Sequence, residues 1–238
     1  MGAEAGTFTE IEVPRDHAEP GATLWALATG AGKDATLALH RVRAEGREVR
    51  YGFNVYDGGS GRVRFHGTRR ALVEAHGRSL GMEMLMDHTR PREFEPVFTG
   101  LLDALRERGV DGVIFGNIHL SDVRAWYEER SGAAGLRHLE PLWGEASREL
   151  AREFVDLGYR AVVVSVDLER GDPGWLGREL DRELIDEIQA RGADPCGEHG
   201  EYHTFVWDGP AFRAPVAFRK GEEVEMKGHR LLDLLPGG

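Results

Sequence analysis

A glycine-rich turn between an apolar run and a helical pattern constrains this chain more than any other stretch. Residues Thr29–Asp34 read Thr-Gly-Ala-Gly-Lys-Asp, and they follow the apolar run Leu24–Ala28. The pattern over Ala35–Val42 is helical, so the local order is strand, turn, helix. In this arrangement small residues let the backbone approach an anion, and the amides at the helix start point toward it. The sequence therefore predicts a phosphate-binding turn, to which Lys33 adds a compact positive charge.

The spacing of the turn excludes two familiar nucleotide loops. A Walker A loop requires Ser or Thr after the lysine, where this chain has Asp34. The Gly-x-Gly-x-x-Gly dinucleotide loop requires a third glycine, which is missing. A tight connection without any ligand is the structural alternative. Lys33 favours the phosphate interpretation because it is one of only three lysines, with Lys220 and Lys227, in a chain that otherwise uses arginine.

Length, charge and cysteine content limit the classes of protein to which this chain can belong. The 238 residues suffice for one large domain, or for one domain with a smaller lobe. The net charge of −11 argues against broad binding to nucleic acid or to anionic membranes. No apolar run reaches the roughly 20 residues of a membrane span, and we see no secretory signal. A single cysteine, Cys196, excludes an internal disulfide, and we expect a cytoplasmic protein.

Apolar strands alternate with amphipathic helices, which predicts an α/β fold. We expect a Rossmann-like, five-stranded parallel sheet with helices on both faces, followed by a small C-terminal α+β lobe. The strands expected in the parallel sheet are residues 23–28, 49–56, 82–86, 110–115 and 160–166. The antiparallel strands expected in the lobe are residues 202–207, 212–220 and 222–226, with a turn at Lys220-Gly221.

The chain divides into an N-terminal arm (1–21), a nucleotide-binding domain (22–135) and a C-terminal part (136–238). Smaller features complete this scheme. We expect an edge strand at 7–13, a helix cap at Ser121, a loop over His138–Gly144 and an apolar core stripe from Phe94 to Leu105.

Ligands of open parallel sheets bind beyond the carboxyl ends of the strands. Three stretches occupy that edge: the turn, the loop after the second strand, and Gly116–His119 after the fourth. We expect these stretches to converge on one ligand. The residues expected to bind it are Ala28, Thr29, Gly30, Ala31, Gly32, Lys33, Asp34, Ala35, Asn54, His66, Gly116 and Asn117.

A second polar stretch, Cys196–Thr204, reads Cys-Gly-Glu-His-Gly-Glu-Tyr-His-Thr. Its two glycines, two carboxylates and two histidines suit a binding loop. They raise the question of a metal site, although the spacing matches no zinc pattern. A polar turn that enters a hairpin is the structural alternative.

Together the two stretches resemble one family. Residues 30–35, Gly-Ala-Gly-Lys-Asp-Ala, resemble the Ser-Gly-Gly-Lys-Asp-Ser loop of the PP-loop ATP pyrophosphatases. Residues 197–204 resemble the Gly-Glu-x-Gly-Glu-[Tyr/Phe]-x-Thr motif of the diphthine–ammonia ligase branch. Phe65-His66 and Phe115–Asn117 also fall where that branch has characteristic segments. The resemblance covers about residues 22–210 and implies a fold of the adenine nucleotide α-hydrolase type.

The resemblance also implies a reaction, in which ATP adenylates a carboxylate, pyrophosphate leaves, and ammonia displaces AMP to give an amide. It implies ATP and Mg²⁺ as cofactors, with Asp34 as a weak Mg²⁺ ligand, and Lys33, Asp34 and Glu201 as catalytic residues. The partners implied are ATP, ammonia and a carboxylate of unknown identity, and a homodimer is left open. The residues that would bind the acceptor substrate are Glu198, Gly200, Glu201, Tyr202, His203 and Thr204.

The turn departs from the family loop at three positions. Gly30, Ala31 and Ala35 replace a serine, a glycine and a second serine, although Thr29 offers a hydroxyl one place earlier. Asn117 stands where an aspartate is expected in many relatives. An adenine-nucleotide-binding protein with little or no ligase turnover is therefore the alternative, as is a ligase that acts on a substrate other than diphthine. A pyrophosphatase that modifies tRNA or a small molecule is disfavoured by the net charge of −11.

Overall fold

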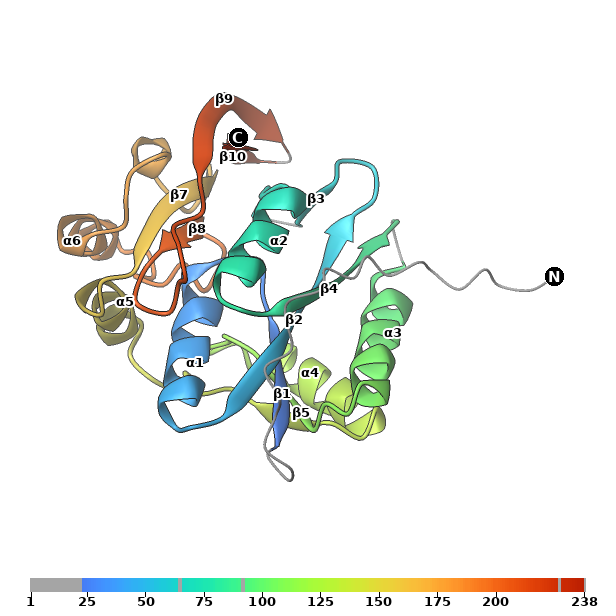
Figure 1. Ribbon diagram of the computed structural model, residues 1–238. Coiled ribbons are helices and arrows are strands. Elements are labelled where there is room, and N and C mark those ends of the chain that lie inside the picture. Colours follow the sequence, from blue (N-terminus) through green and yellow to red (C-terminus); the bar gives the residue numbers. More distant parts are fainter. Residues whose placement is uncertain (1–22, 64–65, 91–92, 227, 238) are drawn as a thin grey trace.

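The computed structural model describes residues 23–63, 66–90, 93–226 and 228–237. The N-terminal arm, the strand expected at 7–13 and Phe65 lie outside the described residues. Figure 1 shows a mainly parallel sheet beside an antiparallel sheet, with helices packed around both. This arrangement confirms the predicted α/β fold class.

The glycine-rich turn at 29–34 extends from the first sheet. Its five parallel strands pair in the order β4, β2, β1, β5, β6, and the short β3 runs antiparallel to the end of β2. The bounds are β1 Leu24–Ala28, β2 Glu48–Asp57, β3 Arg62–Val63, β4 Glu83–Thr89, β5 Gly112–Ile114 and β6 Arg137–Leu139.

Helices cover both faces of this sheet, because successive strand residues point to opposite sides. Trp25 and Leu27 of β1 pack in the core on one side, and Ala26 packs in the core on the other. The helices α1 (Lys33–Ala44) and α2 (Arg70–Ser79) cover the first side, and α3 (Phe94–Glu107) and α4 (Ser121–Ala133) cover the second. The predicted cap at Ser121 is wrong, because Leu120 precedes the helix and makes no side-chain cap.

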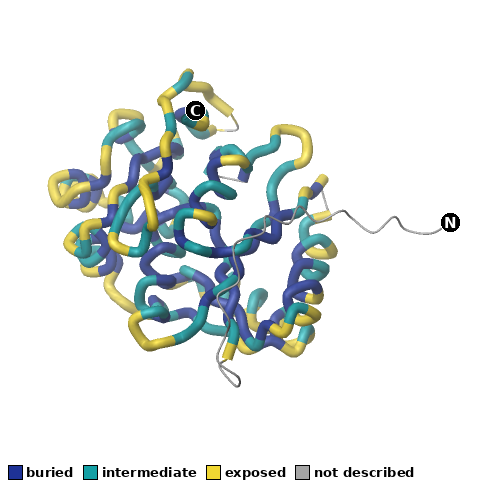
Figure 2. The backbone as a smooth tube through the Cα atoms, viewed as in Figure 1, coloured by how far each residue is buried: buried dark blue, intermediate teal, exposed yellow. Residues whose placement is uncertain are grey.

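The second sheet is antiparallel and pairs in the order β8, β7, β10, β9. Its strands are β7 Arg160–Asp167, β8 Tyr202–Asp208, β9 Phe218–Met226 and β10 His229–Pro236. The helices α5 (Ser147–Asp156) and α6 (Arg182–Ala190) contribute to the core beside it, and a short 3₁₀ turn, η1, spans Pro173–Trp175. Figure 2 shows buried backbone along the strands and exposed residues along the β9 hairpin.

Three strand assignments made from the sequence are wrong. The run at 160–166 is a strand, but it lies in the antiparallel sheet. The fifth parallel strand is β6, which overlaps the start of the region predicted as a loop. An apolar run shows that a strand is buried but does not show which strand it pairs with. Residues 212–217 form no strand, and Lys220-Gly221 lies within β9, where the register against β10 shifts between Leu232 and Leu234.

Several contacts join the two sheets at the start of α1 and near β3. The amide of Val206 in β8 donates to the carbonyl of Ala31 at 2.9 Å. The amide of Lys33 donates to Thr204 Oγ1 at 3.1 Å. Farther out, Arg69 donates two hydrogen bonds to Asp233 of β10, at 2.9 and 2.7 Å. The predicted phosphate turn therefore lies between the two sheets.

Candidate functional site

The glycine-rich turn has a constrained backbone. Ala31 adopts a left-handed conformation with φ of 64° and is fully buried. This conformation costs a non-glycine residue roughly 1–2 kcal/mol, so the surrounding contacts hold it in place. The amide of Ala31 donates to Thr29 Oγ1 at 3.0 Å, which places the Thr29 hydroxyl at the turn. Gly32 precedes the first residue of α1, and no side chain caps the helix there.

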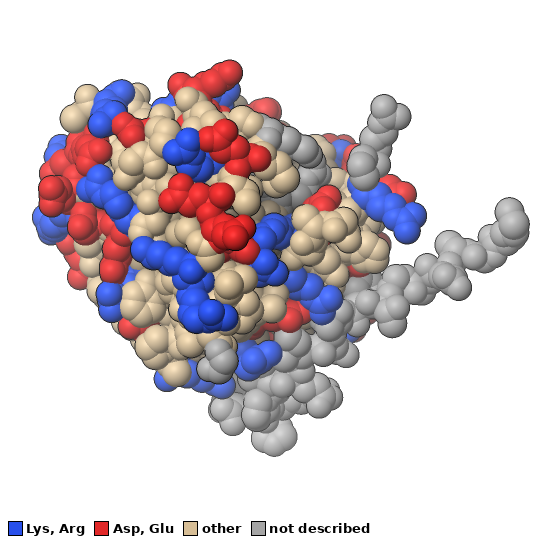
Figure 3. Space-filling view, turned by 90° about the horizontal axis from the view of Figure 1, so that it is seen from above, with Lys and Arg blue, Asp and Glu red and all other residues tan. Residues whose placement is uncertain are grey.

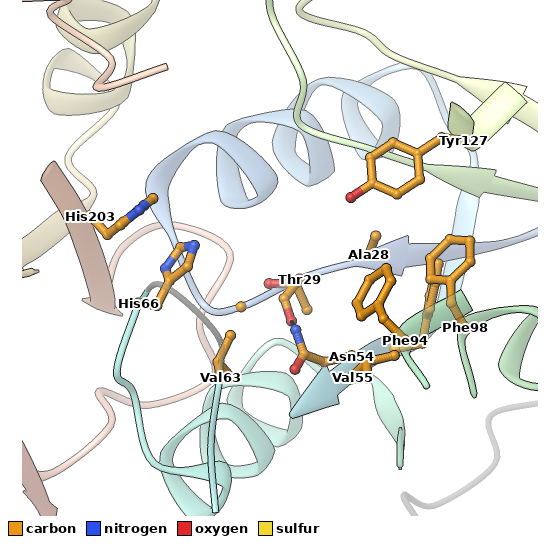
Figure 4. A pocket seen from close by; sticks show the side chains of 12 residues that line it. Ala28, Thr29, Asn54, Val55, Val63, His66, Phe94, Phe98, Tyr127 and His203 are labelled. Atoms are coloured by element: carbon orange, nitrogen blue, oxygen red, sulfur yellow. Dashed lines mark hydrogen bonds between the residues drawn. The ribbon is translucent and has the colours of Figure 1, made fainter. Parts of the chain in front are cut away.

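A pocket of about 480 Å³ opens beside this turn at the carboxyl ends of β1 and β2. The turn forms one end of it and aromatic side chains of α3 and α4 form the other, as Figure 4 shows. The residues that line the pocket are Ala28, Thr29, Gly30, Phe53, Asn54, Val55, Val63, His66, Phe94, Phe98, Tyr127 and His203. Five of the predicted nucleotide-binding residues, Ala28, Thr29, Gly30, Asn54 and His66, are among them.

Asn54 connects the second strand to the turn. Its Nδ2 donates to the carbonyl of Thr29 at 3.0 Å, which fixes the turn against β2. Its Oδ1 is buried and has no hydrogen-bond partner among the described residues. A buried acceptor without a partner is costly, so this oxygen is suited to a donor from a ligand.

Two stacked histidines line the pocket near the turn, and His66 lies against its glycines. A Cβ atom on Gly32 would lie 3.0 Å from Cε1 of His66, so a larger residue there would require the ring to shift by a few tenths of an ångström. The rings of His66 and His203 stack with 4.3 Å between centroids. Burial, with the nearby Lys33 charge, lowers the pKa of His66 to about 4. Burial, with the neighbouring His66, holds the pKa of His203 well below its usual value, so both rings are neutral at pH 7.

Lys33 does not line this pocket. Its ammonium donates to Asp34 Oδ2 at 3.0 Å and to the carbonyl of Cys196, and it lies 5.0 Å from the ring centroid of Tyr202. Burial alone would lower the pKa of Lys33, but Asp34, Tyr202 and Cys196 together raise it above its usual value. Burial raises the pKa of Asp34 although Lys33 acts in the opposite direction. The lysine therefore ties the start of α1 to the loop that precedes β8.

The loop after β5 packs on the first turn of α1. A Cβ atom on Gly116 would lie 2.7 Å from the amide nitrogen of Ala35, so only glycine allows this approach. Asn117 donates to the carbonyl of Leu120 at 3.1 Å, and its Nδ2 lies 3.4 Å from each carboxylate oxygen of Glu140. Neither residue lines the pocket, and neither does the loop at 57–61, so the predicted convergence on one cavity is only partial.

Residues 194–204, which contain the family motif, are called the motif loop here. The carboxylates of this loop accept hydrogen bonds from backbone amides. Glu198 Oε1 accepts from the amides of Ile118 at 2.8 Å and His119 at 3.1 Å. Glu201 accepts from Asp194 N through Oε1 at 3.1 Å and from His199 N through Oε2 at 3.0 Å. Burial raises the pKa of Glu198 although both amides act in the opposite direction.

Two further motif residues, Tyr202 and Thr204, are buried. The Tyr202 hydroxyl donates to the carbonyl of Pro195 at 2.6 Å, and Thr204 accepts from the Lys33 amide. His203 alone of the predicted acceptor-binding residues lines the pocket. In the part of the chain that the structure describes, no group of three His, Cys, Asp or Glu side chains could hold a metal ion.

Phe94 and Phe98 were predicted to be core residues only. Both pack in the core on the α3 side of the sheet, and both also line the pocket. The sequence carried a signal for this role, because the two residues occupy the first turns of the helix that follows β4. Helix starts that follow parallel strands lie at the ligand edge of the sheet.

Among the described helices, none combines the length and apolar character that crossing a membrane requires. The face drawn in Figure 3 mixes basic and acidic side chains and shows no broad basic area.

The fold and the pocket define an α/β protein with a glycine-rich turn beside an aromatic-walled cavity. Two family models extend this description. The model of the diphthamide synthase N-terminal domain matches residues 23–138, and the model of the diphthamide synthase C-terminal domain matches residues 146–232. The chain belongs to the diphthamide synthase family.

Curated relatives agree with the family models. The chain is 29% identical over 152 residues to the diphthine–ammonia ligase of Homo sapiens, covering 62% of this chain and 57% of the relative. It is 28% identical over 160 residues to the diphthine–ammonia ligase of Mus musculus, covering 66% and 59%. The match to the Schizosaccharomyces pombe enzyme covers 63% of this chain and 25% of the relative at 28% identity. The chain thus spans less than two thirds of the length of these relatives.

One solved structure covers most of the chain at low similarity. The predicted subunit of a tRNA methyltransferase from Methanocaldococcus jannaschii aligns over 90% of this chain and 97% of its own, with 13% identity and a TM-score of 0.41. This likeness carries no argument about function.

Proposed function

We propose that this chain is an ATP-dependent ligase that forms an amide and releases AMP and pyrophosphate. The observation that carries the proposal is the pocket that joins the glycine-rich turn to an aromatic wall at the carboxyl ends of β1 and β2. Membership of the diphthamide synthase family and relatives named diphthine–ammonia ligase support the same class of reaction.

The pocket fits an adenine nucleotide in size and chemistry. Its volume of about 480 Å³ lies within the range usual for small-molecule sites. Phe94, Phe98 and Tyr127 offer aromatic surface for the base, and the unpartnered Oδ1 of Asn54 offers an acceptor for an amino group. The turn and the start of α1 would hold the phosphates through backbone amides and the helix dipole. The predicted residues Gly32, Lys33, Asp34 and Ala35 belong to this part of the site.

The proposed reaction has two steps. A carboxylate oxygen of the acceptor attacks the α-phosphorus of ATP, and the bond to pyrophosphate breaks. Ammonia then attacks the acyl carbon, AMP leaves with the electrons of the broken bond, and the nitrogen loses a proton. The chain contributes mainly position and electrostatic stabilisation, because the turn would hold the phosphates in line for displacement.

Asp34 is the acidic residue in the first turn of α1, beside the proposed phosphate site, and its side chain keeps 28% of its surface exposed. Mg²⁺ is usually held by substrate phosphates, waters and only one or two carboxylates, so the site needs no larger cluster. When bound, Mg²⁺ would neutralise phosphate oxygens. Within the protein, Asp34 also keeps the Lys33 ammonium in place.

A second candidate function is nucleotide binding without ligase turnover. The Lys33 ammonium is tied to Cys196 and Asp34 rather than directed into the pocket, and Ala35 lacks the hydroxyl of the family loop. Both features favour a protein that holds a nucleotide but releases pyrophosphate slowly.

Product analysis tests the proposal. The protein is incubated with ATP, Mg²⁺, ammonium and a panel of carboxylates, and nucleotides are separated by ion-exchange chromatography. AMP and pyrophosphate in equal amounts are expected. ADP as the sole product would contradict the ligase reaction, and ATP binding with no product would support the second candidate.

A further inference from the structure

Glu198 is the side chain through which the motif loop contacts the loop after β5. Its Oε1 accepts two backbone hydrogen bonds, from Ile118 at 2.8 Å and from His119 at 3.1 Å. The glutamate comes from the C-terminal half of the chain, whereas both amides come from the loop that ends β5. One acceptor atom therefore holds two consecutive backbone amides in place.

The loop held by Glu198 supports the start of α1. Gly116, two residues before Ile118, approaches the backbone so closely that a Cβ atom there would lie 2.7 Å from Asp34 C and Ala35 N. These are first-turn atoms of the helix that begins at Lys33. A shift of residues 116–119 would therefore also shift the first turn of α1.

The same motif loop holds that helix start from another side. The carbonyl of Cys196 accepts from the Lys33 ammonium, and Thr204 Oγ1 accepts from the Lys33 amide at 3.1 Å. Residues 196–204 thus contact the helix start directly and, through Glu198, support the loop that packs on its first turn. Glu198 itself does not line the pocket.

We infer that Glu198 is a positioning residue that fixes the 116–119 loop against the first turn of α1 and so preorganises the phosphate end of the pocket. This inference rests on the proposed function for the identity of the ligand. It assigns Glu198 no contact with the acceptor, in contrast to the role expected from the family motif. Because one oxygen of residue 198 accepts both hydrogen bonds, the contact requires an acceptor atom at that position. It does not require a negative charge that acts on a ligand.

The test compares Glu198→Gln with Glu198→Ala, and His199→Ala is the matched control. Gln keeps an oxygen at the same position, whereas Ala removes it, and the exposed His199 side chain lies next to Glu198 in the same loop. Hydrogen–deuterium exchange at the Ile118 and His119 amides and the Kd for ATP with Mg²⁺ are measured for each protein. Melting temperatures report whether each variant folds.

For Glu198→Ala we expect faster exchange at both amides and an increase in Kd of about tenfold, which corresponds to about 1.4 kcal/mol. Glu198→Gln should stay within about threefold of the wild-type Kd, and His199→Ala should match the wild type. Equal losses in the Gln and Ala variants would overturn the inference, because they would mean that the charge itself acts on a ligand. Unchanged exchange in Glu198→Ala would also overturn it.

Failure of the proposed function gives a different result. If the wild-type protein binds no ATP, the nucleotide assignment falls, while exchange at Ile118 and His119 still decides whether Glu198 holds the loop. If Glu198→Ala does not fold, Glu198→Asp replaces it: the shorter side chain withdraws the oxygen, so exchange at Ile118 and His119 should be faster than in the wild type, and unchanged exchange would overturn the inference.

Discussion

The two polar stretches of this chain use their side chains in opposite ways. The turn at 29–34 has three small residues among its six, and two of its residues, Thr29 and Gly30, face a pocket. The motif loop at 194–204 is dense in polar side chains, yet both of its glutamates bind backbone amides. A stretch rich in charged residues can therefore serve the fold, and a stretch of small residues can form the ligand site.

Lys33 links the two stretches, and its removal should have the largest effect. In Lys33→Met the carbonyl of Cys196 and the carboxylate of Asp34 lose their common partner. We expect the free energy of unfolding to fall by about 3 kcal/mol, because a half-buried carboxylate is left without its cation. Urea denaturation measures this loss.

Lys220→Met is the control for Lys33→Met. Lys220 also donates to a carbonyl, that of Gly177, but from an exposed position. Its replacement should change the free energy of unfolding by no more than about 0.5 kcal/mol. Similar losses in both variants would mean that Lys33 is not a link between the stretches.

The two motif glutamates should respond differently to the change from Glu to Gln. Glu201 uses both oxygens, so Gln directs an NH₂ group at an amide donor. We expect Glu201→Gln to lower the free energy of unfolding by about 2 kcal/mol, and Glu198→Gln to lower it by less than about 1 kcal/mol. Chemical denaturation of the two variants side by side checks the order, and the reverse order would show that the hydrogen-bond assignments are wrong.

His76 is a buried histidine that contacts α1 and does not line the pocket, so it can be compared with His66 and His203. It is fully buried, its Nε2 lies 3.4 Å from Thr36 Oγ1 of α1, and burial lowers its pKa to about 3. A group whose pKa is lower in the folded state loses its stabilising contribution as the pH falls from about 6.5 toward about 3. The wild type should therefore lose about 2 kcal/mol of stability by pH 5 that His76→Gln does not lose.

Thermal or urea unfolding at pH 7 and pH 5 measures that difference. An equal acid sensitivity of the wild type and His76→Gln would show that other groups, such as His66 and His203, account for the whole effect. A smaller loss in the variant would assign the difference to His76.

The smallest expected effect is at Ala31, where the turn places a non-glycine residue in the left-handed conformation that the motif loop reserves for Gly197 and Gly200. Ala31→Gly removes a conformational cost of roughly 1–2 kcal/mol and adds an entropic cost of roughly 0.5–1 kcal/mol. The net gain in stability should be about 0.5 kcal/mol, measured by the shift of the urea midpoint. A loss above about 1 kcal/mol would show that the buried methyl group matters more than the backbone conformation.

The sequence predicted the fold class and the position of the turn because both depend on local patterns. Glycine spacing and hydrophobic period placed β1, the turn and α1 correctly. The strand at 160–166 was assigned to the wrong sheet, because the choice between β6 and β7 depends on long-range pairing. No local pattern carries that information.

The candidate site was predicted less completely than the fold. Asn54 and His66 line the pocket as expected, whereas the roles of Phe94 and Phe98 depend on where α3 begins relative to the sheet edge. The backbone partners of Glu198 lie 80 and 79 positions away along the chain, which no motif reveals. Their identification required the three-dimensional arrangement.

Binding of ATP at the turn is the central claim, and hydrogen–deuterium exchange with ATP and Mg²⁺ tests it most directly. We predict that ATP slows exchange in peptides that cover residues 28–35 and 53–55, and leaves the β9 hairpin unchanged. Isothermal titration calorimetry on the same sample should give one binding site per chain. Binding without protection at residues 28–35, or no binding at all, would contradict the account.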